Sequence, residues 1–239
     1  MENDDEGIFH YEHVSQVPKS IEKYWWQRHD IFSKYDEGVW MTDDAWFGVT
    51  PEPVAMKVAE HIAAAAPPSK KYIIDAFAGA GGNAMAFART GRWDRVFAVE
   101  LDPHVLKCAK NNAAVYGVDD KITWRHGDCF DVIEKCFQKI LPEAVIFASP
   151  PWGGPSYMAD DIFDLSTMEP YSLSDIYNPF AKVARDIALY LPRTSNLNQL
   201  ATHVTKDTKV QVTHYCMKGA SKALVVYYGD FTFDAAGPT

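Results

Sequence analysis

Apolar segments alternate with amphipathic segments along most of the chain, from about residue 72 to residue 191. Short continuous apolar runs are typical of strands buried on both faces of a parallel sheet. The amphipathic segments between them predict helices that cover the sheet. This alternation indicates an α/β fold with a doubly wound, mostly parallel sheet. The predicted strands are 72–77, 95–100, 122–126, 144–149 and 187–191, and the predicted helices are 82–90, 103–116, 129–140 and 174–184.

The pattern changes near the C-terminus. After a predicted short helix at 196–203, two further strands are predicted over 209–217 and 223–231 from the alternation of apolar and polar residues. The residues between them, 218–221, include Gly219 and suit a tight turn. We therefore predict a terminal antiparallel hairpin on an otherwise parallel sheet.

An N-terminal helical extension precedes this unit. Residues 20–34 carry apolar and aromatic side chains at spacings of three and four, with Ser20 as a candidate N-cap. A second helix is expected to run to about Ala65, with Thr50 as its N-cap and Pro51 at its first position. The predicted divisions are an extension over 1–48 with a disordered start, a core domain over 49–233 and a tail over 234–239.

Composition and charge limit the function. The chain has 239 residues, 47% of them hydrophobic and 23% charged, as in an ordinary globular protein with one main core. No apolar run approaches the roughly 20 residues of a membrane span. The net charge of −9 argues against broad, non-specific nucleic-acid binding but leaves room for a local basic pocket. Four cysteines without a CxxC pair predict free thiols and no metal site.

A candidate cofactor site follows the first three predicted strands. The stretch 75–83, Asp-Ala-Phe-Ala-Gly-Ala-Gly-Gly-Asn, opens a helix, and its glycines allow close approach of a ligand to the backbone. Asp75 suits a ligand that carries an ammonium group. Glu100 ends the second strand, where a carboxylate can accept the hydroxyl groups of a ribose. Asp128 follows the third strand and could accept from an adenine amino group or cap a helix.

A candidate acceptor site follows the fourth strand, at Ser149-Pro150-Pro151-Trp152. Neither proline has an N–H group to donate, so this edge offers a hydroxyl group and carbonyl oxygens. Such groups suit the edge of a flat polar ring, and an indole suits its face. Because indole is the best aromatic face for a cation, Trp152 favours a positively charged ring such as 7-methylguanine. Packing of Trp152 beneath the following loop is the alternative.

Together these features resemble class I S-adenosylmethionine-dependent methyltransferases, whose Rossmann-like sheet ends in an antiparallel hairpin. Further motifs resemble the trimethylguanosine synthase family of cap guanosine-N2 methyltransferases. The resemblance covers about 23–231 and departs from the family at Glu100, where an aspartate is frequent. The motifs that carry it are 149–155 (Ser-Pro-Pro-Trp-Gly-Gly-Pro), the glycine loop, 46–52 (Trp-Phe-Gly-Val-Thr-Pro-Glu), 111–117 (Asn-Asn-Ala-Ala-Val-Tyr-Gly) and 191–193 (Leu-Pro-Arg).

The resemblance implies successive transfer of two methyl groups to N2 of a 7-methylguanosine cap on small nuclear and nucleolar RNAs. It further implies a monomer located in the nucleus and nucleolus, without a membrane partner. The implied cofactor-binding residues are Asp75, Phe77, Gly79, Gly81, Asn83, Glu100, Asp128, Thr50 and Phe32. The implied cap-binding residues are Trp152, Ser149, Pro150 and Pro151, with Lys23 and Arg193 on the cap phosphates. The implied catalytic residues are Ser149, Pro150, Trp152 and Asp75.

Two alternatives remain open from the sequence. The first is a methyltransferase of the same fold that acts on adenine N6 or on a glutamine side chain. The cation argument at Trp152 counts against it. The second is a non-catalytic cap- or RNA-binding protein on a decayed methyltransferase fold. Intact acids at Asp75, Glu100 and Asp128 count against decay.

Overall fold

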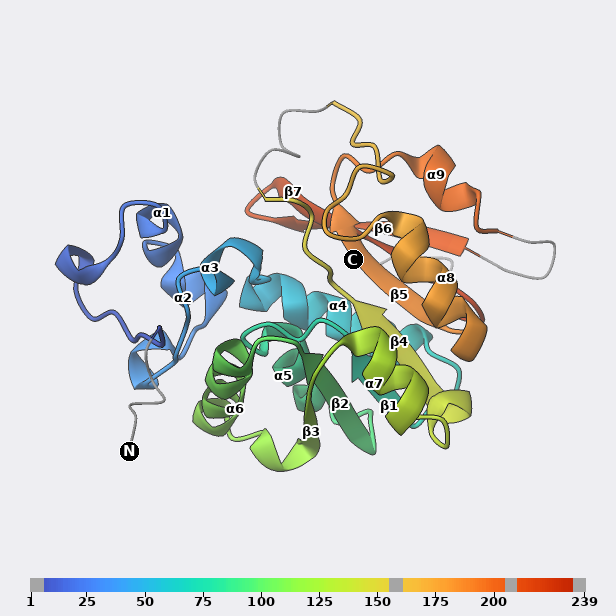
Figure 1. Cartoon of the computed structure of the whole chain (residues 1–239), viewed down its shortest axis with the longest axis horizontal. Coiled ribbons are helices and arrows are strands. Elements are labelled where there is room, and N and C mark those ends of the chain that lie inside the picture. The colour runs from blue at the N-terminus through green and yellow to red at the C-terminus, as the bar shows by residue number, and fades with distance from the viewer. Residues whose placement is uncertain (1–6, 155–160, 205–209, 234–239) are drawn as a thin grey trace.

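The computed structural model describes residues 7–154, 161–204 and 210–233. These residues form a seven-stranded sheet in the order β3-β2-β1-β4-β5-β7-β6, flanked by helices (Figure 1). The predicted α/β fold with a terminal antiparallel hairpin is therefore confirmed. The strands are β1 (Tyr72–Asp75), β2 (Arg95–Glu100), β3 (Ile122–His126), β4 (Ala144–Ala148), β5 (Ile187–Pro192), β6 (Val210–Met217) and β7 (Ala220–Tyr228).

The direction of the strand order reverses between β1 and β4. The chain moves outward from β1 to β2 and β3, then returns to pair β4 with the other side of β1. Strands β1 to β5 run parallel to one another, whereas β7 is antiparallel to β5 and to β6. In open α/β sheets, ligands bind at the carboxyl ends of the strands beside such a reversal. The candidate site is therefore expected at the ends of β1 and β4.

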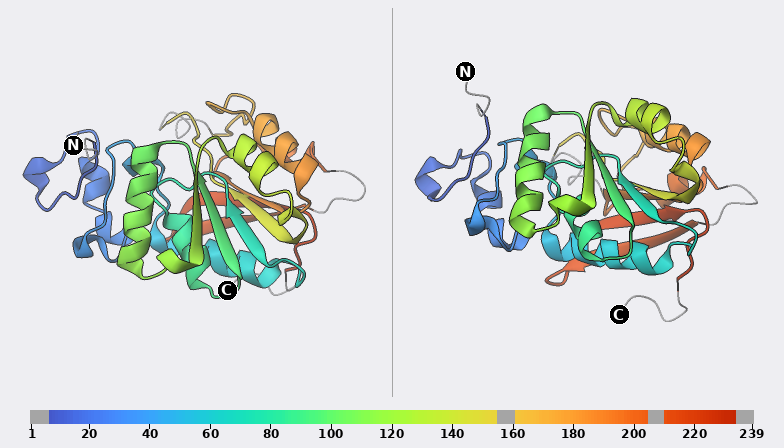
Figure 2. Two further views of the ribbon diagram at one scale, coloured as in Figure 1. Left: turned by 60° about the horizontal axis from the view of Figure 1, so that its bottom comes forward. Right: turned by 90° about the horizontal axis from the view of Figure 1, so that it is seen from below.

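Helices cover both faces of the sheet (Figure 2). One buried cluster joins α4, α5 and α6 to one face, and a second joins α7, α8 and α9 to the other. No helix in the described part of the chain has the length and apolar character that crossing a bilayer requires. The α-helices are α1 (Glu22–Trp25), α2 (Arg28–Ile31), α3 (Ala45–Gly48), α4 (Glu52–Ala65), α5 (Gly82–Arg89), α6 (Pro103–Tyr116), α7 (Cys129–Cys136), α8 (Leu173–Val183) and α9 (Leu197–Ala201).

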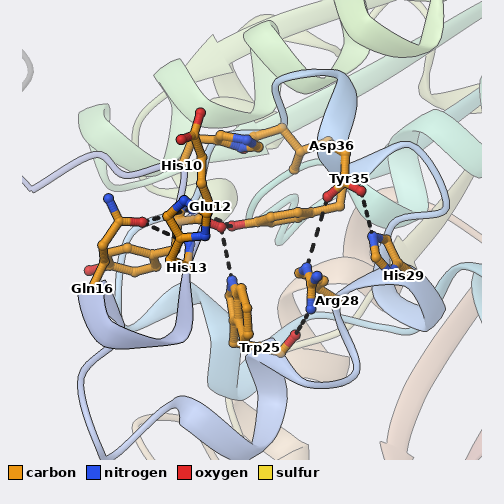
Figure 3. Close-up of polar contacts among 11 residues, drawn as sticks. His10, Glu12, His13, Gln16, Trp25, Arg28, His29, Tyr35 and Asp36 are labelled. Atoms are coloured by element: carbon orange, nitrogen blue, oxygen red, sulfur yellow. Dashed lines mark hydrogen bonds and ion pairs between the residues drawn. The ribbon is translucent and has the colours of Figure 1, made fainter.

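The extension packs beside α6 at one end of the molecule (Figures 1 and 2). It also has polar contacts of its own (Figure 3). The buried indole of Trp25 donates to the Tyr11 carbonyl over 3.0 Å, and the Tyr35 hydroxyl donates to the same oxygen over 3.2 Å. The Arg28 guanidinium lies 3.9 Å from the centre of the Trp25 ring. These contacts make the extension a compact unit, and its apolar residues belong to the same buried cluster as α4 and α5.

Several predicted boundaries were wrong. The helix predicted over 20–34 is divided into α1 and α2, because Gln27 bonds back to the Tyr24 carbonyl in a tighter turn. Ser20 is not its N-cap, since α1 begins at Glu22. Helix α4 begins at Glu52 with Pro51 in the cap position, and the Thr50 hydroxyl accepts from Asn83 instead of capping α4.

The hairpin turn is shorter than predicted. It consists of Lys218 and Gly219, both at positive φ (51° and 78°), so β7 already begins at Ala220. A two-residue turn with positive φ at both positions matches the twist of the strands that it joins. The predicted disordered start overlaps residues 1–6, and the predicted tail is 234–239; both ranges lie outside the described residues. So do 155–160 in the loop after β4.

A buried ion pair joins four segments near the amino ends of the parallel strands. Lys70 Nζ lies 2.9 Å from Asp186 Oδ2, and the two side chains are 8% and 2% exposed. Lys70 also donates to the Pro142 carbonyl over 3.0 Å, and Asp186 Oδ1 accepts from the backbone N–H of Asp230. Gly229 is required beside this pair, because a Cβ there would lie 2.5 Å from Asp186 Oδ1.

We expect Asp186→Ala to lower the free energy of unfolding by about 3–5 kcal/mol, because Lys70 would remain buried without its counter-charge. Chemical denaturation measures this loss. Lys71→Ala is the control, because it removes an ion pair to Glu143 that is exposed to solvent. Equal stability of the wild type and Asp186→Ala would contradict the importance of this pair.

Candidate functional site

The predicted site residues meet at the carboxyl edge of the sheet. Asp75 ends β1 and pairs in register with Ala98 on β2 and Phe147 on β4. Glu100 therefore lies two residues after Ala98, the partner of Asp75 on β2. Ser149 lies two residues after Phe147, the partner of Asp75 on β4. The reversal of strand order thus places the candidate cofactor acids beside the candidate acceptor motif.

The glycine loop between β1 and α5 depends on backbone angles that favour glycine. Gly79 and Gly81 have positive φ values of 52° and 93°. A Cβ on Gly81 would also approach Ala109 and the Trp124 ring to 3.3 Å each. The loop therefore packs closely on its own core, and its outer backbone stays free of side chains at these two positions.

Asp75 is the most unusual group at this edge. Its side chain is fully buried, and neither carboxylate oxygen makes a well-formed hydrogen bond within the described residues. Burial raises the pKa of Asp75 to about 7, while the nearby N–H groups of Phe77 and Ala84 oppose the rise and the charge of Glu100 adds to it. A buried carboxylate without a partner is suited to a cationic group supplied by a ligand.

Glu100 supports the glycine loop directly. Its Oε2 accepts from the Gly79 N–H over 2.8 Å, and its Oε1 accepts from the Asp102 N–H over 2.8 Å. Burial raises the pKa of Glu100, and these backbone bonds oppose the rise. Each carboxylate oxygen can accept a further bond, so Glu100 can still bind two hydroxyl groups.

Asp128 caps α7, as one of its two sequence interpretations predicted. Its Oδ1 accepts from the N–H groups of Phe130 and Asp131 over 2.9 and 3.3 Å. Phe77 lies close to this helix start, with ring centroids 6.3 Å from Phe130 and 6.2 Å from Tyr171. These rings form an aromatic wall beside the third acid, which suits the face of a planar base.

Phe32 of the extension and Thr50, just beyond the extension, lie on the other side of this region. Thr50 is buried, and its hydroxyl accepts from Asn83 Nδ2 over 3.3 Å. Asn83 Oδ1 is buried without a hydrogen-bond partner in the described structure. Phe32 is also buried, with its ring edge-to-face against Tyr116 at 6.3 Å. The structure thus brings Thr50 to the start of α5 and places Phe32 against α6.

The acceptor motif contains Trp152, whose indole ring packs against another aromatic ring on one face. Trp152 stacks on Tyr190 of β5, with ring centroids 5.7 Å apart and planes 16° apart, and it remains partly exposed. Trp152 also packs against both core clusters, so the packing alternative accounts for part of its environment. Ser149 is partly exposed, Pro150 is buried and Pro151 is exposed. An open pocket lies beside this motif, lined by Pro151, Gly153, Gly154, Glu169 and Pro170.

The two predicted phosphate-binding cations come from different segments of the chain. Lys23 is exposed on α1, with Nζ 4.7 Å above the Tyr24 ring. Arg193 is exposed just beyond β5 and donates to the Ser221 carbonyl over 3.4 Å. Within the described residues these two cations do not touch each other. Lys218 at the hairpin turn links the hairpin to the extension, because its Nζ lies 2.7 Å from Asp30 of α2.

Sequence reasoning missed two residues of the acceptor region. Tyr190 lies within an apolar strand, where nothing in the local pattern distinguishes it from a core residue. Glu169 lies in the long loop after β4 and lines the open pocket. One signal for Glu169 was available: a cationic ring stacked on Trp152 favours an acid nearby, and Glu169 is an acid in the loop that follows this motif.

These residues fit S-adenosylmethionine. Its ammonium group would supply the missing partner of Asp75, its ribose hydroxyl groups suit Glu100, and its adenine suits the aromatic wall and Asp128. The residue types at the edge are carboxylates, aromatics and backbone amides. Among the described residues, no group of three or more His, Cys, Asp and Glu side chains is placed to hold a metal ion.

Comparison with known proteins gives a consistent result. Residues 70–231 match the family described as RNA cap guanine-N2 methyltransferase. The chain is 33% identical to trimethylguanosine synthase of Schizosaccharomyces pombe over 89% of this chain and 87% of that protein. It is 34% identical to trimethylguanosine synthase of Saccharomyces cerevisiae over 89% of this chain and 68% of that protein.

A solved structure supports the fold. The O-methyltransferase of Bacillus cereus, determined with S-adenosylhomocysteine, superposes with a TM-score of 0.54 at 15% identity. The superposition covers 90% of this chain and 94% of that protein. The class I methyltransferase fold is thereby shown for this chain.

The buried Asp75 carboxylate predicts a pH-dependent cost in stability. Its folded pKa of about 7 exceeds the usual value of about 3.9, so folding becomes less favourable as the pH rises between these two values. We expect Asp75→Asn to be more stable than the wild type, with a difference that grows by about 2 kcal/mol between pH 5 and pH 7.

Chemical denaturation of both proteins at several pH values measures this difference. Asp119→Asn, which changes an exposed carboxylate, is the matched control and should show no comparable trend. A difference between Asp75→Asn and the wild type that stays constant from pH 5 to pH 7 would contradict the raised pKa.

Proposed function

The chain belongs to the RNA cap guanine-N2 methyltransferase family, and we propose that it transfers two methyl groups in succession to N2 of a 7-methylguanosine cap. It is an enzyme that uses S-adenosylmethionine to methylate the cap guanine. The product of two transfers would be 2,2,7-trimethylguanosine. The names of the two yeast relatives support this second transfer.

One observation carries the proposal at the level of residues. The partly exposed indole of Trp152 lies four residues after the end of β4, the strand that pairs with β1 and Asp75. One face of this indole stacks on Tyr190. A braced indole beside a cofactor crevice suits stacking with a cationic purine, because the attraction includes a cation–π contribution. Neutral adenine would gain less from the same indole.

The cofactor roles follow from the unsatisfied groups at the edge. Asp75 would pair with the ammonium group, Glu100 with the ribose and Asp128 with the adenine amino group. Phe77 would contact the adenine base. Gly79, Gly81 and Asn83 would let the backbone of the loop approach the cofactor closely. Thr50 and Phe32 would close the site from the side of the extension. When bound, S-adenosylmethionine supplies an electrophilic methyl group on a sulfonium.

The acceptor residues would position a weak nucleophile. The lone pair of the guanine amino group is delocalised into the ring, so attack depends on orientation. The carbonyl oxygens of Ser149 and Pro150 can accept hydrogen bonds from the N–H groups of the guanine amino group. Pro151 fixes the turn that leads to Trp152. Transfer would form the bond from N2 to the methyl carbon as the carbon–sulfur bond breaks, with S-adenosylhomocysteine as the leaving group, and the extra proton on N2 would then pass to water. Ser149 would orient the ring.

The RNA substrate is the less defined part of the proposal. We expect Lys23 and Arg193, both exposed, to bind the cap phosphates. Small nuclear and nucleolar RNAs are the proposed substrates, and the nucleus, including the nucleolus, is the proposed location. The enzyme is proposed to act as a monomer.

Mass analysis of a capped RNA tests the function. After incubation with S-adenosylmethionine, a 7-methylguanosine cap should gain first one and then two methyl groups, whereas an unmethylated guanosine cap should gain none. A single added methyl group at completion would contradict the second transfer. No added methyl group would contradict the proposed activity.

Trp152→Ala should weaken binding of 7-methylguanosine diphosphate by about 2 kcal/mol or more, because the cation–π contact and the stacking surface are lost. Trp152→Phe should lose less. Calorimetry with this ligand and with S-adenosylhomocysteine separates cap binding from cofactor binding, which should change little.

Trp26→Ala is the matched control, because Trp26 lies on the extension and is 60% exposed. Equal affinity of the wild-type enzyme for methylated and unmethylated guanosine diphosphate would refute the role assigned to Trp152. Unfolding of Trp152→Ala, with normal cap affinity in Trp152→Phe, would show that Trp152 serves packing alone.

A further inference from the structure

Helix α6 carries a motif, Asn111 to Gly117, that has no role in the cofactor or cap contacts described above. Three of its side chains bind the extension instead. All three contact backbone groups of residues 33–40, directly or through Glu52. This face of α6 is therefore the docking surface of the extension.

Asn112 makes the most complete of these contacts. Its side chain is fully buried, and Oδ1 accepts from the Trp40 N–H over 2.8 Å. Nδ2 donates to the Trp40 carbonyl and to the Ala80 carbonyl, each over 3.0 Å. Ala80 lies between Gly79 and Gly81 in the cofactor loop. One amide thus binds the extension and the cofactor loop at once.

Tyr116 forms the second junction. Its hydroxyl accepts from the Lys34 N–H over 3.2 Å and donates to Glu52 Oε2 over 2.7 Å. Glu52 Oε2 also accepts from the Ser33 N–H over 2.8 Å, and Oε1 forms an ion pair with Arg89 of α5 at 2.6 Å. The hydrogen bonds of Tyr116 and Glu52 hold the backbone on the C-terminal side of Phe32.

Asn111 adds a third, more exposed contact. Its Nδ2 donates to the Gly38 carbonyl over 2.8 Å. The contacts therefore fix the segment from Ser33 to Trp40 at several points along its length. Because the extension has its own internal contacts, fixing this segment also fixes the orientation of α1 and Lys23.

We infer that Asn112 and Tyr116 are positioning residues: Asn112 joins the docked extension to the cofactor loop, and Tyr116 holds the extension against α6, so that the methyl donor and the cap bind cooperatively. The inference rests on the proposed function. A cofactor seated on the Gly79–Gly81 loop fixes the Ala80 carbonyl that Asn112 contacts, and hence strengthens the hold on Trp40. The docked extension in turn places Lys23 where it can contact a cap phosphate. Coupling of this kind is reciprocal between the two ligands.

Tyr116→Phe tests the inference with the smallest change. It removes one hydroxyl group and keeps the ring that contacts Phe32. Tyr228→Phe is the matched control, because it also removes a buried hydroxyl bond, to the Leu200 carbonyl over 3.0 Å, away from the extension. Calorimetry measures the dissociation constant of S-adenosylhomocysteine with and without saturating 7-methylguanosine diphosphate.

The wild type and Tyr228→Phe should bind S-adenosylhomocysteine more tightly when the cap ligand is present. In Tyr116→Phe this enhancement should fall by about 3–10-fold, which corresponds to the loss of one or two hydrogen bonds. Asn111→Ala is a second variant with a partly exposed change, and it should also reduce the enhancement.

The outcomes separate the inference from the function on which it rests. If the wild type binds both ligands independently, or if Tyr116→Phe and Asn111→Ala keep the full enhancement, the inference is wrong while the proposed function stands. If the wild type binds neither ligand, the proposed function itself fails. Should Tyr116→Phe not fold, Asn111→Ala decides the question.

Discussion

The candidate cofactor site depends on the burial of one carboxylate at the point where strand order reverses. Asp75 ends the central strand, and packed layers on both faces of the sheet exclude water from its oxygens. Desolvation of an acid opposes folding, and the apolar cores must offset this cost. The same desolvation makes Asp75 a strong partner for a cation, because the attraction between opposite charges is stronger in a medium of low polarity.

Much of this arrangement could be predicted because local signals and global topology agreed. Helix α6 has the predicted bounds, since Asp102 caps it, Pro103 opens it and Gly117 ends it in a left-handed conformation. The ends of β2 and β3 also match their predicted bounds, whereas β1 ends at Asp75 instead of residue 77 and β7 ends at Tyr228 instead of residue 231. The predicted caps Ser20 and Thr50 were wrong, and for Thr50 the reason is a tertiary partner. Thr50 is bonded to Asn83, 33 residues away.

The candidate site was predictable only in part. Acids at consecutive strand ends fall at one edge by topology, so Asp75, Glu100 and Asp128 could be grouped from the sequence. The role of Asn112 could not be derived in this way, although its motif could be recognised. Its partners are backbone atoms of Trp40 and Ala80, which are 72 and 32 residues distant. A contact to a backbone atom leaves no pattern in the partner's residue type.

That last property has an evolutionary consequence. Asn111, Asn112 and Tyr116 hold the extension through peptide groups at Lys34, Gly38 and Trp40. The side chains of Lys34 and Trp40 can therefore drift without loss of these bonds, whereas the three α6 residues cannot, and Gly38 is restricted to glycine by its positive φ of 103°. We expect selection to fall unequally on the two partners, so that relatives present a different outer surface toward RNA on the same α6 contacts. New RNA preferences could then evolve without redesign of the methyl-transfer site.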